Sequence, residues 1–255
     1  HEDLTEELGW EPRRITHLVV FDDTDYSQGI TYVGAQNRIE LWVVAPDSES
    51  TLEDFEDWLT LLVTHEYTHL VHIDQARGLP VLINAIFGQV YHPMQFTPTW
   101  LTEGYAVHEE SATSTGGRVR SSMFDMYLRM AVLEDEFLRI DQVTNSTREF
   151  PQGNAPYLYG QDFMNYVARR FGEDILQELA EEMSDDLIPY GLNRSFRRVT
   201  GFTATQLWDD WRESLEIGYR AVADRLREEG LTSSRRLTDF GERNGPPRFS
   251  PDGQS

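Results

Sequence analysis

Two runs of apolar residues near the start of the chain have the character of β-strands. Residues 15–21 (ITHLVVF) and 38–45 (RIELWVVA) are rich in β-branched and aliphatic side chains, and a polar, glycine-containing segment separates them. The pattern predicts that the chain opens with strands of a small β-sheet.

Beyond Thr51 the apolar positions recur at helical spacing. The segment EDFEDWLTLLVTHEYTHLVHID begins with acidic residues, as helix starts often do, and its pattern ends near Gly78 and Pro80. We expect further helices over residues 99–112, 121–137, 157–183 and 203–229. Strands followed by a run of helices predict an α+β fold, with a small N-terminal sheet beside a mainly helical lobe.

The predicted elements all fall within residues 1–230, which we interpret as one domain. Residues 231–255 are polar and rich in Gly, Pro and Ser, so they are expected to be a linker or the start of another unit. No uninterrupted apolar run approaches 18 residues, so no membrane span is predicted. The first ten residues lack the basic-then-apolar order of a signal peptide, which indicates a mature or trimmed piece of a protein.

The net charge of the chain limits which classes of binding partner are expected. Its 44 Asp and Glu residues face 22 basic residues that are all arginine, and the formal net charge is -22. Such a surface repels nucleic acid phosphates and anionic lipid headgroups, so neither is expected as a partner. An acidic surface without lysine is typical of proteins that work in high salt, although simple compositional bias would give the same counts.

The chain has no cysteine, so any metal must be held by His, Asp or Glu. His65 and His69 are four residues apart in a predicted helix, and their imidazoles can therefore bind a single cation. Glu66 lies about 100° round the helix, where it can contact a water on that cation. The alternative is a pair of core histidines, which would leave several buried polar groups without partners.

A catalytic zinc ion takes three protein ligands and keeps a fourth position for water. Glu103 is the best candidate for the third ligand, because it lies in the first turns of the helix predicted within residues 98–110 (PTWLTEGYAVHEE). Gly104 beside it has no side chain and would allow this helix to approach the first one closely.

These two motifs together resemble those of the gluzincin metallopeptidases, which combine H-E-x-x-H with a downstream W-x-x-E-G-x-A. Trp100, Glu103, Gly104 and Ala106 match the second motif position by position. The resemblance implies a thermolysin-like arrangement with a cleft between the sheet and the helical lobe. It also implies Zn²⁺ as the cofactor. Residues 79–97 make the insert between the motifs longer than in the aminopeptidases of this group, and could form a helical excursion near the cleft.

A third match lies in residues 155–172 (APYLYGQDFMNYVARRFG). Gluzincin aminopeptidases carry P-Y-x-x-G at the start of a helix, and Pro156, Tyr157 and Gly160 occupy those positions. The resemblance implies that the Tyr157 hydroxyl donates to the oxyanion of a tetrahedral intermediate. Tyr159 is a second candidate for this role, and the alternative for Tyr157 is simple packing at a helix start.

The chain departs from the aminopeptidases in the strand that binds the free amine of their substrates. Residues 34–38 (GAQNR) compare with the G-A-M-E-N strand of that family, and Asn37 stands where the family has its glutamate. This departure favours an endopeptidase of a peptidase MA-like branch over an aminopeptidase. We expect residues 34–43 to form the edge strand that binds an extended peptide.

The resemblance implies a zinc peptidase whose substrate is a peptide or protein. Glu66 would be the general base and Tyr157 the oxyanion donor, with His65, His69 and Glu103 as the zinc ligands. One alternative is a non-catalytic module that captures peptides or docks a neighbouring domain, and another is hydrolysis of a non-peptide bond.

The last ten residues, 246–255 (PPRFSPDGQS), resemble the P-x-F-S-P-D-G signature that opens blades of TolB-like β-propellers. This resemblance implies that the natural protein continues into a β-propeller. It also suggests a periplasmic or extracellular location, because such combinations are typically exported. A proline-rich end without a fold is the alternative.

Overall fold

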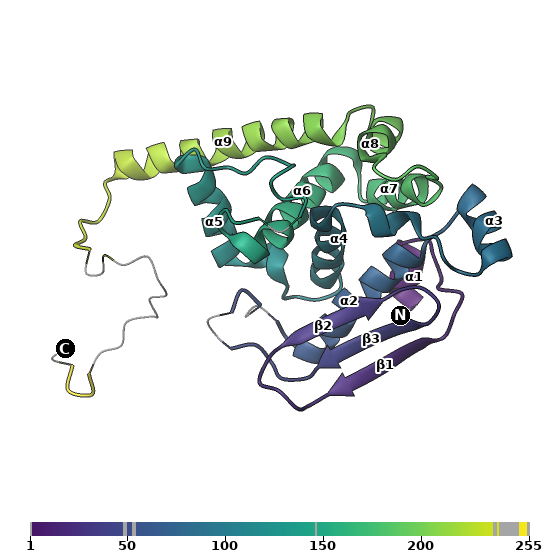
Figure 1. Cartoon of the computed structure of the whole chain (residues 1–255). Helices are drawn as coiled ribbons and strands as arrows, with labels where there is room; N and C mark the ends of the chain where they lie inside the picture. The colour runs from purple at the N-terminus through teal and green to yellow at the C-terminus, as the bar shows by residue number, and fades with distance from the viewer. Residues whose placement is uncertain are drawn as a thin grey trace.

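The computed structural model describes residues 2–47, 50–52, 55–145, 147–236, 239 and 250–253. Three strands form one mixed sheet beside a helical lobe (Figure 1): β1 (Thr16–Phe21), β2 (Gln28–Tyr32) and β3 (Asn37–Trp42). β3 is central, with β1 parallel to it on one side and β2 antiparallel on the other. The predicted α+β class is confirmed.

The position of β3 corrects one prediction. Residues 34–43 do not form an edge strand, because β3 has a hydrogen-bonded neighbour on each side, and Asn37 is buried at its start. The edge that faces the helical lobe is β2, which packs against α2 (Trp58–Asp74). The sequence pattern missed β2 because QGITY is short and contains a glycine and a glutamine, both poor strand signals.

The helical lobe follows α1 (Glu2–Glu7) and the sheet in the chain. After α2 come α3 (Gly78–Phe87), α4 (Thr99–Ala112), α5 (Ser122–Leu133), α6 (Ala155–Phe171), α7 (Asp174–Ser184), α8 (Leu192–Thr200) and α9 (Ala204–Glu229), with 3-10 turns at Pro93–Phe96, Arg118–Arg120 and Gln152–Asn154.

Most of the predicted helices are confirmed, and α4 spans the predicted range 99–112. The single helix predicted over 157–183 is two helices, α6 and α7. The chain turns between them at Gly172, whose φ of 102° lies in the left-handed region that favours glycine. α1 and α8 were not predicted.

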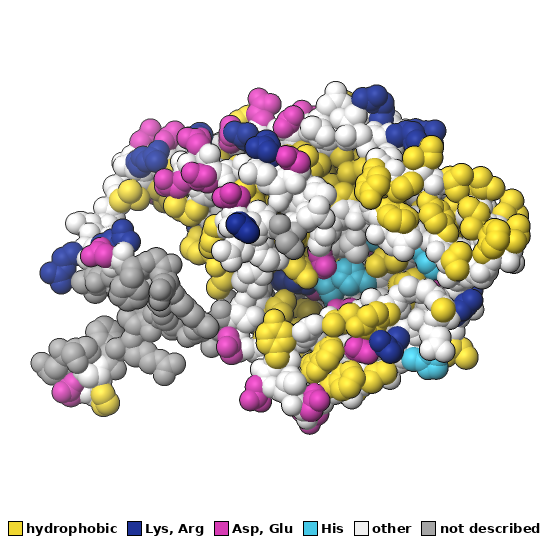
Figure 2. Space-filling view, viewed as in Figure 1, with side chains coloured by type: hydrophobic (Ala, Val, Ile, Leu, Met, Phe, Trp, Pro, Cys, Tyr) yellow, Lys and Arg dark blue, Asp and Glu magenta, His cyan; other side chains and the backbone are white. Residues whose placement is uncertain are grey.

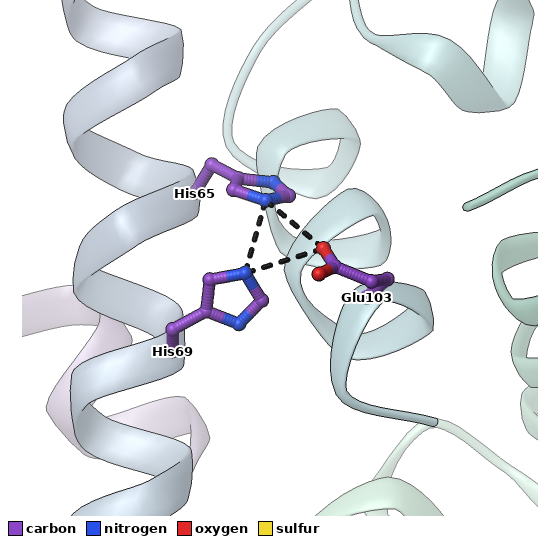
Figure 3. Close-up of side chains that lie close together, drawn as sticks. All are labelled: His65, His69 and Glu103. Carbon is purple, nitrogen blue, oxygen red and sulfur yellow. Dashed lines mark hydrogen bonds and ion pairs between the residues drawn. The ribbon is translucent and has the colours of Figure 1, made fainter. Parts of the chain in front are cut away.

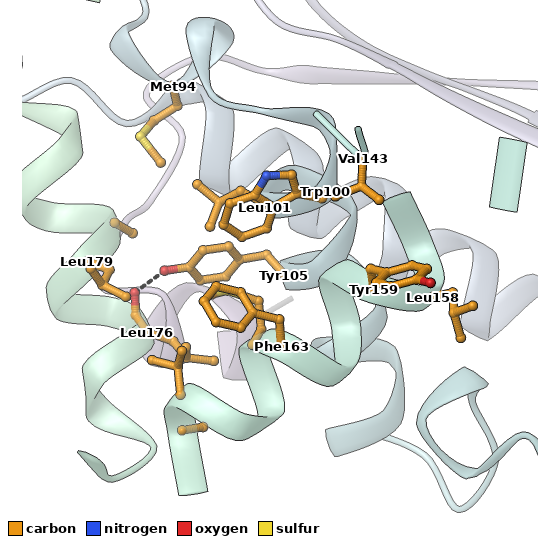
Figure 4. Packing of buried hydrophobic residues seen from close by; sticks show 14 of the residues in the cluster. Met94, Trp100, Leu101, Tyr105, Val143, Leu158, Tyr159, Phe163, Leu176 and Leu179 are labelled. Atoms are coloured by element: carbon orange, nitrogen blue, oxygen red, sulfur yellow. Dashed lines mark hydrogen bonds between the residues drawn. The ribbon is translucent and has the colours of Figure 1, made fainter. Parts of the chain in front are cut away.

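An aromatic core holds α4, α6 and α9 together. Trp100 of α4 lies 5.4 Å from the Phe163 ring of α6 and 5.7 Å from the Trp208 ring of α9, measured between ring centroids. Tyr105 packs in the same layer and donates its hydroxyl hydrogen to the Leu176 carbonyl (Figure 4). Burying each such side chain contributes about 1.5–3 kcal/mol. The core therefore fixes the helix that carries Glu103.

Two sequence predictions concern the chain ends and the membrane. The propeller-like signature in residues 246–255 lies largely outside the described residues, as does most of the segment 231–255. Within the described part of the chain, no helix combines the length and the apolar character that crossing a bilayer requires.

Candidate metal centre

The first two candidate ligands are held by α2. Asp57 caps the start of this helix, because its Oδ1 accepts a hydrogen bond of 2.6 Å from the Thr60 backbone N–H. The helix then runs without interruption past His65 and His69, which lie one above the other on its buried side. The i, i+4 spacing thus places both imidazoles on the same face, as predicted.

The structure brings the three predicted ligands together (Figure 3). The Nε2 atoms of His65 and His69 are 3.1 Å apart, and Glu103 Oε2 is 3.3 Å from each of them. In a tetrahedral zinc site with bonds of about 2.0–2.1 Å, ligand atoms lie roughly 3.3–3.4 Å from one another. The triangle therefore has the size that one such ion requires.

The hydrogen bonding of these atoms also fits a cation. Glu103 Oε2 is buried and has no hydrogen-bond partner among the described residues, although both imidazoles approach it at ion-pair distance. A buried carboxylate oxygen without a hydrogen-bond partner costs free energy, and a cation bound between it and the two imidazoles removes that cost. His65, His69 and Glu103 can therefore hold a metal ion.

The charged groups of this site strongly affect one another's pKa values. Burial lowers the pKa of His65, but the nearby carboxylates of Glu103 and Glu110 outweigh this and raise it to about 9. Burial also opposes ionisation of Glu103, yet the His69 and His65 imidazoles lower the pKa of this carboxyl overall. A cation that binds Nε2 of His65 must displace a proton from it.

Glu66 lies beside the ligands and is positioned by β2. The Thr31 hydroxyl donates a shared hydrogen bond to two oxygen atoms of Glu66, the backbone carbonyl and the carboxylate Oε2. Thr31 Oγ1 lies 2.8 Å from each of them. A Cβ atom at Gly29 would lie 2.4–2.6 Å from the Glu66 side chain. Gly29 therefore leaves the space that the carboxylate fills, while Thr31 orients it.

Tyr157 reaches the site because α4 and α6 approach each other closely. A Cβ atom at Gly104 would lie 2.7 Å from the Gly160 backbone, and one at Gly160 would lie 2.0 Å from the Trp100 carbonyl oxygen. Gly104 thus allows the approach of α6, not of α2 as the sequence suggested. The glycines of the second and third motifs face each other, and this contact places Tyr157 near Glu103.

The surroundings of Tyr157 keep its hydroxyl protonated. Its ring is half-buried and stacks on that of His65, with centroids 6.3 Å apart. Burial and the Glu103 charge raise the pKa of Tyr157 above its usual value, despite the opposing effect of Arg118. Tyr159, the second candidate, is buried in the core, where its hydroxyl accepts a hydrogen bond from the Leu138 N–H.

Two residues that support His65 were not assigned from the sequence. Glu110 is fully buried, and its Oε2 lies 3.1 Å from His65 Nδ1. Arg118 pairs with Glu110 through contacts of 2.8 Å and 2.9 Å, and its guanidinium lies 4.8 Å from the centre of the Tyr157 ring. A carboxylate on the far nitrogen of a ligand imidazole orients the ring and raises its basicity.

Only part of this support was detectable in the sequence. Glu110 follows Glu103 by seven residues, two helical turns, so the two share a face. Arg118 has no comparable signal, because it comes from the turn after α4. Asp74, the last residue of α2, accepts a hydrogen bond of 3.0 Å from Trp10 Nε1. His72 is buried against Tyr105, and burial lowers its pKa to about 3.

Open space lies on both sides of the three ligands. A cavity of about 400 Å³ is bounded by Gln28, Trp58 and Arg118, and a second of about 260 Å³ by Ile30, Ile73 and Thr102. Both cavities also reach His65, Glu66 and Tyr157. Figure 2 shows histidine side chains at the bottom of this hollow, between the sheet and the helical lobe. The site is a cleft that an extended ligand can cross.

Comparison with known proteins gives little further guidance. An uncharacterized protein of Treponema pallidum (strain Nichols) is 26% identical over 178 residues, which make up 70% of this chain but 15% of that protein. The chain thus spans a small part of the length of this relative. No protein-family model matches the chain, and no solved structure matches it.

Proposed function

We propose that this chain is a zinc-dependent peptidase, with the thermolysin-like arrangement of a small sheet over a helical lobe. The observation that carries the proposal is the triangle of His65, His69 and Glu103, with Glu66 and Tyr157 beside it. A bound zinc ion would supply a water of lowered pKa and would polarise the scissile carbonyl.

The residues of the chain have separate roles in this proposal. Glu66 accepts the proton of the attacking water and delivers it to the leaving amine, and its hydrogen bond to Thr31 holds the carboxylate in place for both transfers. Tyr157 donates its hydroxyl hydrogen to the oxygen that becomes negative during attack. One such donor in a site without bulk water contributes about 3–4 kcal/mol.

The cleft favours an endopeptidase that binds its substrate along β2. One edge of β2 pairs with β3. Gly29, Ile30 and Thr31 of this strand line the cavity beside the ligands, so a peptide can pair with the other edge of β2 as a further strand. Among the described residues that line the two cavities, the only carboxylates are Glu66 and Glu103. Among the described lining residues, the free amine of an aminopeptidase substrate therefore finds no separate acidic partner.

A metal and activity measurement tests the proposal. The purified chain should bind zinc stoichiometrically, as measured by mass spectrometry, and should digest casein in a reaction that a chelator stops and zinc restores. Glu66→Gln should keep the metal and lose about 10²–10⁴-fold in turnover. Glu213→Gln, on the exposed surface of α9, is the matched control and should leave turnover unchanged.

The outcomes separate a peptidase from a binding module. If the unaltered chain binds zinc and peptides but cleaves none of a peptide library, the fold serves only capture or docking. If Glu66→Gln hydrolyses casein like the unaltered chain, the assignment of the base is wrong. A downstream β-propeller and a periplasmic or extracellular location remain proposals that rest on residues 246–255 and on the resemblance.

A further inference from the structure

The outer edge of the sheet is β1, which pairs with β3 on one side and with no other strand among the described residues (Figure 1). The Phe21 carbonyl accepts a hydrogen bond of 3.1 Å from the Val43 N–H, so Phe21 bonds toward β3. Alternate residues of a strand bond to the same side. The N–H and C=O groups of Thr16, Leu18 and Val20 therefore point to the free edge.

The side chains along this edge are apolar and uncovered. Leu18 and Val20 pair in register with Ile39 and Leu41 of β3, so the four side chains share one face of the sheet. Ile39 and Leu41 are buried, whereas Leu18 and Val20 are 54% and 57% exposed. The helical lobe therefore stops short of β1. An edge with free bonding groups and apolar side chains is a template for a further strand.

Charges of opposite sign flank the two ends of β1. Arg13 and Arg14 precede the strand, Asp22 and Asp23 follow it, and all four side chains are exposed. The contacts of the two arginines are with a tryptophan ring and a backbone carbonyl, which carry no charge. Within the described part of the chain none of the four forms an ion pair. One end of the edge is therefore basic and the other acidic.

We propose that β1 pairs antiparallel with β1 of a second copy of this chain, which joins the two three-stranded sheets into one. With a two-fold axis beside Leu18, this residue meets its own copy, and Thr16 meets Val20. These are the residues whose bonding groups face outward, so the backbones of both copies are satisfied. The same register sets Arg14 of each copy opposite Asp22 of the other.

The charge pattern selects both the orientation and the partner. A parallel pairing would set Arg14 against Arg14 and Asp22 against Asp22, and like charges that face each other are unfavourable. In the antiparallel pairing each basic end meets an acidic end. A second copy therefore complements this edge at both ends through the same residues.

The net charge of -22 on each copy opposes the association, and Glu11 and Asp25 near the ends of β1 add to this repulsion. In 1 M salt the screening length falls to about 3 Å, so the repulsion between the two molecules is largely removed. Backbone hydrogen bonds between the strands are not screened in this way. We therefore expect a weak, reversible dimer that forms in high salt.

The dimer leaves both candidate metal centres accessible. In the joined sheet the two β2 strands lie at the outer ends, because β3 separates β1 from β2 in each copy. The edge of β2 beside the metal ligands stays free in both copies. The dimer therefore requires neither zinc nor catalysis, and its test is independent of the proposed peptidase activity.

Sedimentation velocity of the whole chain in 1 M salt, over a series of protein concentrations, tests the charge pattern. The unaltered chain should dimerise reversibly. Arg14→Asp should raise the dimer dissociation constant about tenfold or more, because acids then face each other at both ends. Arg14→Asp/Asp22→Arg has the net charge of the unaltered chain and should restore the dimer. Arg148→Asp, the matched control at another exposed arginine, should dimerise like the unaltered chain.

Leu18→Pro tests the backbone pairing. The Leu18 N–H points to the free edge, so proline removes a hydrogen bond of the dimer and none to β3. This variant should be monomeric, with the far-ultraviolet circular dichroism spectrum of the unaltered chain.

Four results would overturn the proposal. They are an unaltered chain that stays monomeric over the whole series, equal weakening by Arg14→Asp and Arg148→Asp, no recovery of the dimer in Arg14→Asp/Asp22→Arg, and an undiminished dimer in Leu18→Pro. Circular dichroism and melting curves of all variants, compared with the unaltered chain, show that they are folded.

Discussion

At the scale of single residues, Glu66 shows how the sheet contributes to the candidate site. Its carboxylate fills the space above Gly29 and receives a hydrogen bond from Thr31, two residues on the same side of β2. A strand that the sequence pattern did not detect therefore orients the residue that the motif predicted to be the base.

Replacement of Thr31 tests this positioning role. Thr31→Val keeps the shape of the side chain but removes the donor, so kcat should fall about 10–100-fold, the range for a hydrogen bond to a charged group. Thr31→Ser retains the hydroxyl and should restore most of kcat. Zinc content and KM should stay the same in both variants. Equal kcat for the Val and Ser variants would show that the hydrogen bond has no role.

Glu109 is a buried acid with no part in the metal site. Its side chain is buried, and its Oε2 lacks a hydrogen-bond partner among the described residues. Burial is the largest cause that raises its pKa, and the charge and hydrogen bond of Glu7 and the charge of Glu173 add to it. The pKa of Glu109 is about 9 in the folded protein, against an ordinary value of 4.5.

This raised pKa makes folding depend on pH. Between about pH 4.5 and 9 the folded chain holds a proton on Glu109 that the unfolded chain releases, so the contribution of this group to stability falls as pH rises. Glu109→Gln should flatten the decline in the free energy of unfolding between pH 5 and 9, measured by urea denaturation. The exposed Glu213→Gln should not. Parallel pH curves for Glu109→Gln and the unaltered chain would contradict the raised pKa.

At the scale of elements, the crossing of α4 and α6 positions the site. The two helices carry Glu103 and Tyr157, and their backbones meet at Gly104 and Gly160. Both glycines belong to motifs that the sequence singled out for chemistry, but their contact is a packing requirement. The motifs therefore encode the distance between the helices as well as the reactive groups.

A methyl group at this crossing should separate the helices. Gly160→Ala would place Cβ 2.0 Å from the Trp100 carbonyl oxygen, and both atoms are close to rigid backbone. We expect a loss of about 1–3 kcal/mol in the free energy of unfolding. Gly218→Ala is the control on α9, where a Cβ meets nothing within 4 Å, and it should stabilise the chain by about 0.5–1 kcal/mol. Urea denaturation measures both, and equal values would refute the close approach.

At the scale of the whole molecule, the net charge of -22 opposes compaction. Many arginines pair with acids at the surface, for example Arg170 with Asp210 at 2.7 Å, but such exposed pairs contribute little each. The excess acids remain unneutralised by the chain, so their mutual repulsion should be relieved chiefly by dissolved cations.

Salt should therefore stabilise this protein. Raising the ionic strength from about 0.1 M to 1 M shortens the screening length from roughly 10 Å to 3 Å. We expect Tm to rise by several degrees at pH 7.5 in differential scanning calorimetry. The same change should have a much smaller effect near pH 4.6, the isoelectric point, where the net charge vanishes. An equal rise at both pH values would show that charge repulsion is not the cause.

The sequence by itself determined most of the helices, the α+β class and the five residues around the candidate metal. His65, Glu66 and His69 follow from spacing within one helix, because 3.6 residues per turn fix which side chains share a face. Glu103 and Tyr157 were found through motifs, and the structure confirms that Glu103 joins the histidines. These features depend on residues that lie close together in the sequence, so short sequence patterns predict them.

Only the tertiary structure decided which strand faces the cleft and what surrounds the metal ligands. β2 takes the edge because β3 pairs on both sides, and Arg118 reaches His65 from 53 positions away. Glu109 is buried by the packing of other segments around α4, and the apolar residues of α3 stay exposed because no segment covers them. Such features depend on contacts between residues that are far apart in the sequence. Those contacts form only when the whole chain folds, so the local spacing of residues does not predict them.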